Sequence, residues 1–105
     1  MNRHKLPNRR PSDLLDINHR GQPYAASIGY FDDGTPAEIF LDPPKRSNDM
    51  ENLARDAALL ISIALQHRIP IEEMRQSVGR NDDGVPHSVV GAALDALAAH
   101  AREAS

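Results

Sequence analysis

The stretch YAASIGYFDDGTPAEIFLD, residues 24–42, decides the fold of this chain. Side-chain character alternates with a period of two over residues 24–31 and again over 37–42, which is typical of β-strands. Between these runs lies DDGT at 32–35, a sequence typical of a hairpin turn. The stretch therefore predicts two antiparallel strands, which end at Pro43-Pro44 because proline cannot extend a strand ladder.

A third alternating run, residues 14–20, precedes a turn at Gly21-Gln22-Pro23, so we predict a three-stranded antiparallel meander. One face of the hairpin is mainly apolar and is expected to pack on the core. The other face combines small residues with two phenylalanines, and we expect it to be open to water in a monomer. A flat apolar patch of this kind is typical of a contact surface. The residues expected on it are Ala25, Ser27, Gly29, Phe31 and Phe40.

Three helices are predicted after the meander, over residues 48–67, from Pro70 to about Gly79, and over residues 89–102. The run AALLISIAL at 57–65 is apolar on nearly every side of the first helix. We therefore expect other helices or a second subunit to cover that helix on every side. Strands followed by helices, without strand–helix alternation, predict an α+β domain of two layers.

Charge divides the chain of 105 residues into a basic arm and an acidic body. Residues 1–12 carry four basic groups and no acid, whereas 13–105 carry eight basic and fifteen acidic groups, which gives +4 and −7 and the net −3. We predict a flexible arm, 1–12, and a single domain, 13–105. There is no cysteine, so disulfide scaffolds and thiolate metal sites are excluded. No apolar run approaches the length of a membrane span, and we expect a cytoplasmic protein.

The sequence shows no catalytic constellation. Adjacent carboxylates occur at 32–33, 72–73 and 82–83, but neighbouring side chains point to different faces, so they predict no acid–base pair. We expect no catalytic residue, no metal site and no cofactor. The histidines lack the spacings typical of a metal site; they are His4, His19, His67, His87 and His100.

Two groups of residues are candidates for binding. Lys45, Arg46 and Ser47 stand at the predicted start of the first helix, where cations and free backbone N–H groups favour an anion such as phosphate or a nucleotide. A solvated loop with a capping serine explains the same residues. The second group is the arm, which either contacts a partner or acts as a solubilising tail. Its basic residues are Arg3, Lys5, Arg9 and Arg10.

Most of residues 6–97 resembles the TSCPD domain, which occurs at the C-terminus of adenosylcobalamin-dependent ribonucleotide reductases and in small stand-alone bacterial proteins. The segments that carry the resemblance are LPNRR (6–10), SIGYFDDG (27–34), EIFL (38–41), Ser47, DAALLISIALQH (56–67), IPIEEM (69–74) and GVPHSVVGAALDAL (84–97). The family is named for a motif with cysteine, which this chain lacks, so no zinc or thiol role carries over. Arg46 and Arg68 stand where the family often has glycine, and for Arg68 this predicts a differently built helix end.

The resemblance implies a non-catalytic accessory or binding module associated with ribonucleotide reductase, with the reductase large subunit as a possible partner. Any reductase activity would belong to a neighbouring domain. The alternative is a small nucleic-acid-associated protein that acts through its arginine-rich arm, although the acidic body makes nucleic acid an unfavoured partner. A small hydrolase or transferase is the third and least favoured hypothesis. We also expect a homodimer, formed through the open sheet face or through an exposed side of the helices.

Overall fold

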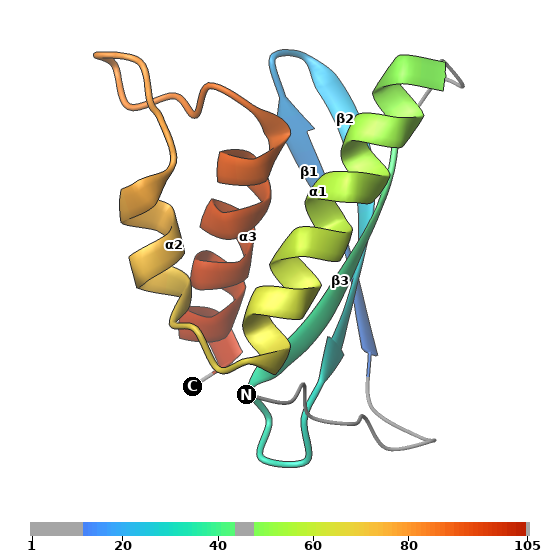
Figure 1. Cartoon of the computed structure of the whole chain (residues 1–105), viewed down its shortest axis with the longest axis vertical. Helices are drawn as coiled ribbons and strands as arrows, with labels where there is room; N and C mark the ends of the chain where they lie inside the picture. The colour runs from blue at the N-terminus through green and yellow to red at the C-terminus, as the bar shows by residue number, and fades with distance from the viewer. Residues whose placement is uncertain (1–11, 44–47, 105) are drawn as a thin grey trace.

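The computed structural model describes residues 12–43 and 48–104, and it confirms the α+β arrangement (Figure 1). The strands form one antiparallel sheet in the order β1-β2-β3, and three helices follow. All six elements start and end within two residues of the predicted positions. They are β1 (Ser12–His19), β2 (Gln22–Tyr30), β3 (Pro36–Asp42), α1 (Asn48–Gln66), α2 (Ile71–Ser77) and α3 (Val89–Ala104). Ser12, which we had assigned to the arm, is the first residue of β1.

The turn between β1 and β2 lies one residue earlier than predicted. Arg20 and Gly21 both have positive φ, 54° and 79°, which is the backbone of a two-residue type I′ hairpin turn. The side-chain oxygen of Asn18 accepts a hydrogen bond from the Gly21 N–H at 3.1 Å. Gln22 and Pro23, predicted in the turn, therefore belong to β2, where they pair with His19 and Asn18.

The two DDG sequences form the same turn in different settings. In the β2–β3 connection the Gly34 N–H donates to the Phe31 carbonyl, and in the α2–α3 connection the Gly84 N–H donates to the Asn81 carbonyl. Both glycines have positive φ, 88° and 89°. The second aspartate of each turn accepts a hydrogen bond from a backbone N–H two residues later. The likeness is one of turn chemistry and does not mark a repeated domain.

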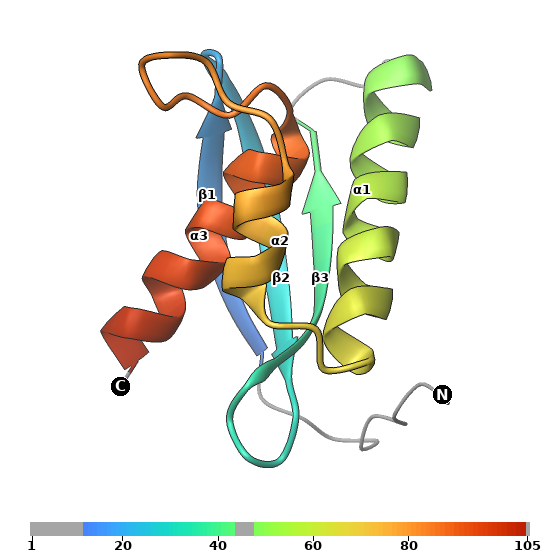
Figure 2. The ribbon, with the colours of Figure 1, turned by 60° about the vertical axis from the view of Figure 1, so that its left-hand side comes forward.

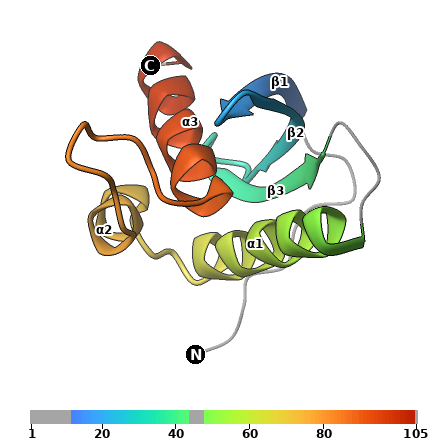
Figure 3. The same cartoon turned by 90° about the horizontal axis from the view of Figure 1, so that it is seen from above.

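The helices cover one face of the curved sheet (Figures 2 and 3). α1 lies along β3, α3 packs on β1, and α2 packs against α3. The core lies between these layers. Its most deeply buried large side chains are Ile28, Ile39, Leu94 and Leu97.

The burial predictions hold only in part. Within one copy the other helices do not cover α1 on every side: Leu53, Leu59 and Leu60 are 68%, 53% and 67% exposed, because α1 lies at the edge of the fold, against β3. The second subunit that we expected as the alternative cover stays a prediction. On the far sheet face, Ala25 and Phe40 are exposed as predicted, but Gly29 and Phe31 are buried. Phe31 lies beyond the end of β2, so the strand alternation does not reach it. The remaining residue of that patch, Ser27, pairs with Phe40 and is partly buried.

The end of α1 keeps the left-handed form although no glycine is present. Arg68 has φ 61°; its N–H donates to the Leu65 carbonyl at 2.9 Å, and the Ile69 N–H donates to the Ala64 carbonyl at 3.0 Å. These are the two hydrogen bonds of a Schellman motif. The expectation of a differently built helix end is therefore wrong: the helix ends in the usual motif, with arginine at the position where glycine is usual.

The side chain of Arg68 has contacts that offset this backbone. Its guanidinium lies 3.9 Å from the centre of the Phe31 ring, and the same group donates to Asp33 at 3.2 Å and to Thr35 at 3.0 Å. The pKa of Asp33 is lowered, first by the hydrogen bonds from Thr35 and then by Arg68. Arg68 thereby ties the end of α1 to the β2–β3 turn.

Candidate functional site

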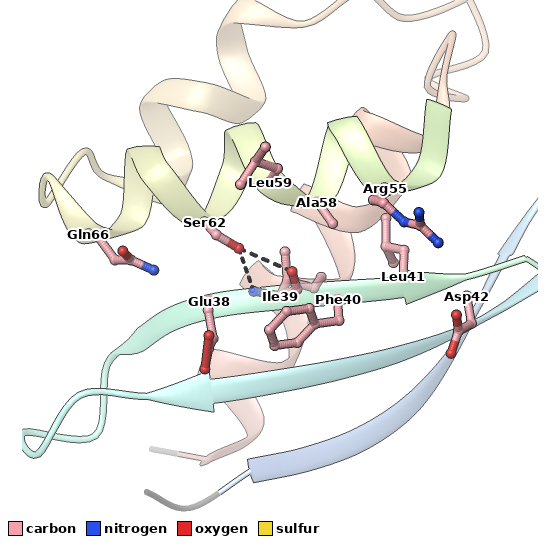
Figure 4. Close-up of a pocket in the computed structure, with 10 residues that line it drawn as sticks. All are labelled: Glu38, Ile39, Phe40, Leu41, Asp42, Arg55, Ala58, Leu59, Ser62 and Gln66. Carbon is pink, nitrogen blue, oxygen red and sulfur yellow. Dashed lines mark hydrogen bonds between the residues drawn. The ribbon is translucent and has the colours of Figure 1, made fainter. Parts of the chain in front are cut away.

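A groove of about 500 Å³ lies between β3 and α1 (Figure 4). Phe40 from β3 and Leu59 from α1 stand at its mouth, and both side chains are more than half exposed. The helix lies beside an edge strand, so the groove has a wall of backbone on one side and a wall of side chains on the other. An apolar mouth of this kind suits an apolar side chain of a ligand or partner.

Hydrogen bonds from α1 satisfy part of the open edge of β3. The Ser62 hydroxyl accepts from the Ile39 N–H at 2.9 Å and donates to the Ile39 carbonyl at 3.1 Å, as Figure 4 shows. The Gln66 amide donates to the Ala37 carbonyl at 3.0 Å. Ser62 and Gln66 are both buried. These two side chains replace the neighbouring strand that an edge strand lacks.

The next part of the same edge has no such cover. Backbone groups alternate along a strand, so the Leu41 N–H and carbonyl point to the same side as those of Ile39. One turn before Ser62, α1 presents Ala58, whose methyl group forms no hydrogen bond. Within residues 12–43 and 48–104, no side chain donates to or accepts from these Leu41 groups. The groove therefore combines an apolar mouth with one pair of backbone groups that no side chain in the described ranges satisfies.

Charged side chains of both signs line the groove. Arg55 and Asp42 lie toward the start of α1, and Glu38 lies toward its end (Figure 4). Arg55 pairs with Glu51 at 3.3 Å, but 72% of its side chain remains exposed, so the pair is weak and the guanidinium is accessible. Glu38 is buried. Arg55 and Asp42 therefore offer polar contacts at one end of an apolar centre.

A second polar cluster joins α2, α3 and the loop between them. Asp95 accepts a hydrogen bond from the Arg75 Nε at 2.9 Å and a forked pair from the guanidinium of Arg80. Arg75 also pairs with Glu72 at 2.9 Å. The hydrogen bonds from Arg80 are the main reason why the pKa of Asp95 is lowered. This cluster fixes α2 and its loop on α3, since α2 has no buried residue of its own.

A third cluster joins the sheet to α3. The Tyr30 hydroxyl donates to Asp13 at 2.6 Å, and the His100 Nε2 lies 2.8 Å from the same carboxylate oxygen. Burial is the main reason why the pKa of Tyr30 is raised, and the Tyr30 hydrogen bond is the main reason why that of Asp13 is lowered. In the second and third clusters the pKa shifts favour the ordinary form of each shifted group at neutral pH, so they are typical of structural pairs.

The structure does not test the binding residues chosen from sequence. Lys45, Arg46 and Ser47 lie outside the described residues, and so does the basic arm with Arg3, Lys5, Arg9 and Arg10. The anion site and the arm contact stay predictions. Three histidines are placed apart: His19 lies 3.0 Å from the Pro86 carbonyl, His100 lies at Asp13, and His67 follows α1. No group of three metal-ligating side chains forms among the described residues.

Sequence reasoning missed the groove. The signal was present, because Ser62 and Gln66 are polar residues four apart in an otherwise apolar run, and side chains at that spacing share one helix face. What the sequence did not reveal was that this face meets the edge of β3.

Comparison with known proteins identifies the domain. The family model of the TSCPD domain matches residues 15–101. This chain belongs to the TSCPD domain family. The match begins within β1 and ends within α3, so it spans the sheet, the three helices and the groove.

The TSCPD chain is also similar to two curated reductases. It is 35% identical over 71 residues to a vitamin B12-dependent ribonucleotide reductase of Agrobacterium fabrum, and 30% identical over 71 residues to one of Bradyrhizobium diazoefficiens. In each case the match covers 68% of this chain but only 6% of the reductase. No solved structure matches significantly. In the described part of the chain, no helix has the length and apolar character that crossing a membrane requires.

Proposed function

We propose that this TSCPD protein is a non-catalytic accessory module that binds the large subunit of a B12-dependent ribonucleotide reductase through the β3–α1 groove. The observation that carries the proposal is the groove itself. Phe40 and Leu59 expose apolar surface on either side of it, and no side chain of the described residues forms a hydrogen bond with the Leu41 backbone between them. Exposed apolar side chains around a hollow are typical of an interaction site.

The similarity to reductases supports the choice of partner. The two curated relatives are both B12-dependent ribonucleotide reductases, and each is matched over a small part of its length. We do not extend the whole reductase activity to a chain that spans 6% of those proteins. We propose instead that a domain of the kind found in a reductase binds a reductase.

The chemistry of the described residues supports a binding role. A general acid or base works best with a pKa near the operating pH. Here the resolved shifts lower the pKa of Asp13, Asp33 and Asp95 and raise that of Tyr30, so each moves away from neutrality. The proposed setting is the bacterial cytoplasm, in keeping with the bacterial relatives and with the absence of cysteine.

A partner segment would bind the groove as an extended peptide. An apolar side chain would lie between Phe40 and Leu59, while the peptide backbone would exchange hydrogen bonds with the open groups of Leu41. Arg55 and Asp42 would then select polar groups at one end of the segment. This mode needs no movement of α1, because Ser62 and Gln66 keep their hydrogen bonds to β3.

The test uses the full chain and the reductase large subunit from the same organism, with the dissociation constant measured by titration calorimetry. Leu59→Glu and Phe40→Asp place charges at the groove mouth, and we expect each to weaken binding at least tenfold, about 1.4 kcal/mol. Leu60→Glu is the matched control, because it introduces the same charge one residue along α1 but away from the groove. No binding by the native chain, or equal loss with Leu60→Glu, would contradict the proposal.

A further inference from the structure

A second exposed stripe on α1 is not used by the groove. Leu53 and Leu60 are 68% and 67% exposed; the buried Ala57 forms the floor between them, and the partly buried Ala64 follows one turn after Leu60. Their spacing of four, three and four residues keeps all four side chains within one narrow sector of the helix. Leu59 lies outside this sector, on the side of the β3 groove. We call these four residues the α1 stripe.

The α1 stripe is complementary to itself in one orientation. When two copies of α1 are placed antiparallel about a two-fold axis between residues 58 and 59, Leu53 of each copy faces Ala64 of the other. In the same register Leu60 faces Ala57. A large side chain therefore meets a small one at every level, which allows two helices to pack closely. A two-fold contact needs this self-complementarity, because the same patch serves both copies.

The shape beside the stripe accommodates a partner's leucines. A hollow of about 270 Å³ between α1 and α3 is lined by Leu53 and Ala57, and a second of about 340 Å³ is lined by Leu60 and Ile69. The leucines that the stripe exposes would lie over these hollows in the other copy. Packing would remove both exposed leucines of each chain from water.

Charge favours the antiparallel orientation. Asp49 and Glu51 lie in the first turn of α1, while His67 and Arg68 follow its last turn. The antiparallel register brings the acidic start of each helix near Arg68 of the other, which pairs with Asp33 but keeps 46% of its side chain exposed. It also opposes the two helix dipoles.

Charge argues against the sheet face as the contact between two copies. Asp16 and Asp42 lie with Phe40 around a hollow on that face, and the described residues that line the hollow include no basic side chain. Two such faces brought together would place like charges opposite each other, which is costly when they lose water.

We infer that a second copy of this chain binds the α1 stripe, forming an antiparallel two-fold pair in which each leucine lies on the partner's alanine. This gives the expected homodimer a single interface, through α1 and away from the sheet. The inference does not depend on the reductase as partner, because the β3–α1 groove lies on the other side of the helix.

Light scattering after size exclusion tests the interface. At about 100 µM we expect the native chain to have twice the 11.5 kDa of a single chain. Leu60→Glu should halve the mass and keep the native circular dichroism, because Leu60 is mostly exposed in one copy. Leu59→Glu is the matched control and should leave the dimer intact. A native monomer, or a dimer that Phe40→Asp dissociates while Leu60→Glu does not, would overturn the inference.

Cysteine cross-linking tests the orientation, since the native chain has no cysteine. Leu53→Cys and Ala64→Cys chains mixed under oxidising conditions should give a disulfide-linked pair of one chain of each kind. Either variant alone should give little, because in the antiparallel register its own cysteines lie about 16 Å apart along the axis. Efficient linking of each variant to itself, with none in the mixture, would instead show a parallel contact and refute the proposed register.

Discussion

Arg68 makes the strain at the end of α1 measurable. Replacing it with alanine or with glycine removes the same contacts with Phe31 and Asp33, but only glycine also relieves the left-handed backbone. The two variants should therefore differ by the strain alone. A non-glycine residue in this conformation costs about 1–2 kcal/mol.

The side-chain contacts of Arg68 set how far each variant's free energy of unfolding differs from the native value. A cation over an aromatic ring at an exposed site contributes about 0.5–1 kcal/mol. The pair with Asp33 adds little, because both side chains are roughly half exposed. Arg68→Gly loses these contacts and gains the backbone relief, so its free energy of unfolding should stay within about 0.5 kcal/mol of the native value. Arg68→Ala loses the contacts and keeps the strain, which predicts a loss of about 0.5–1 kcal/mol.

Urea unfolding followed by circular dichroism gives the comparison. For a slope of about 2 kcal/mol per molar, a difference of 1 kcal/mol moves the midpoint by about 0.5 M. The control is the same pair of substitutions at His67, the residue before the left-handed position; there glycine should be no more stable than alanine. Equal midpoints for Arg68→Ala and Arg68→Gly would refute the argument that Arg68 holds a strained backbone.

Two further predictions concern stability. Ser62→Ala leaves the buried N–H and carbonyl of Ile39 without their partner, so we expect the free energy of unfolding to fall by about 1–3 kcal/mol and the Ile39 amide to exchange faster by NMR. Ser77→Ala, at an exposed hydroxyl, is the control and should change neither quantity. Asp95→Asn should cost about 1–2 kcal/mol at neutral pH, because the carboxylate accepts from two arginines. The pKa of Asp95 is lowered in the folded chain, so its contribution is present above the ordinary carboxyl value of 3.8 and is lost as pH falls through the folded value. The urea midpoints of native and Asp95→Asn chains should converge in acid, and a constant difference down to pH 2 would contradict the assignment.

The elements of the fold were predictable because their signals are local. Alternation over 24–31 and 37–42 depends on the period of the strand, and the DDG turns depend on residues within four positions of each other. The predicted exposure of Phe40 and Phe31 shows the limit of such signals, because only Phe40 is exposed. Phe40 lies in a strand and follows the alternation, whereas Phe31 lies beyond one and is covered by Arg68, far along the chain.

The candidate site was not predictable in the same way. Ser62 and Gln66 look like polar breaks in an apolar helix until β3 is placed beside them. The binding residues that the sequence did suggest, 45–47 and the arm, lie outside the described residues and await their own test. Composition and motif alone therefore suggested binding through basic residues, whereas the described structure indicates binding through an apolar groove.

The sequence by itself determined the order of strands and helices, the turns between them and the membership of the TSCPD family, since each depends on neighbouring residues or on their order. Only the tertiary structure decided which apolar side chains stay exposed. Leu59, Leu60 and Ile61 are consecutive and equally apolar, yet they face the groove, the stripe and the core. The physical reason is that a helix turns about 100° per residue, so burial depends on where β3 and α3 lie around it, and no local pattern in α1 records that.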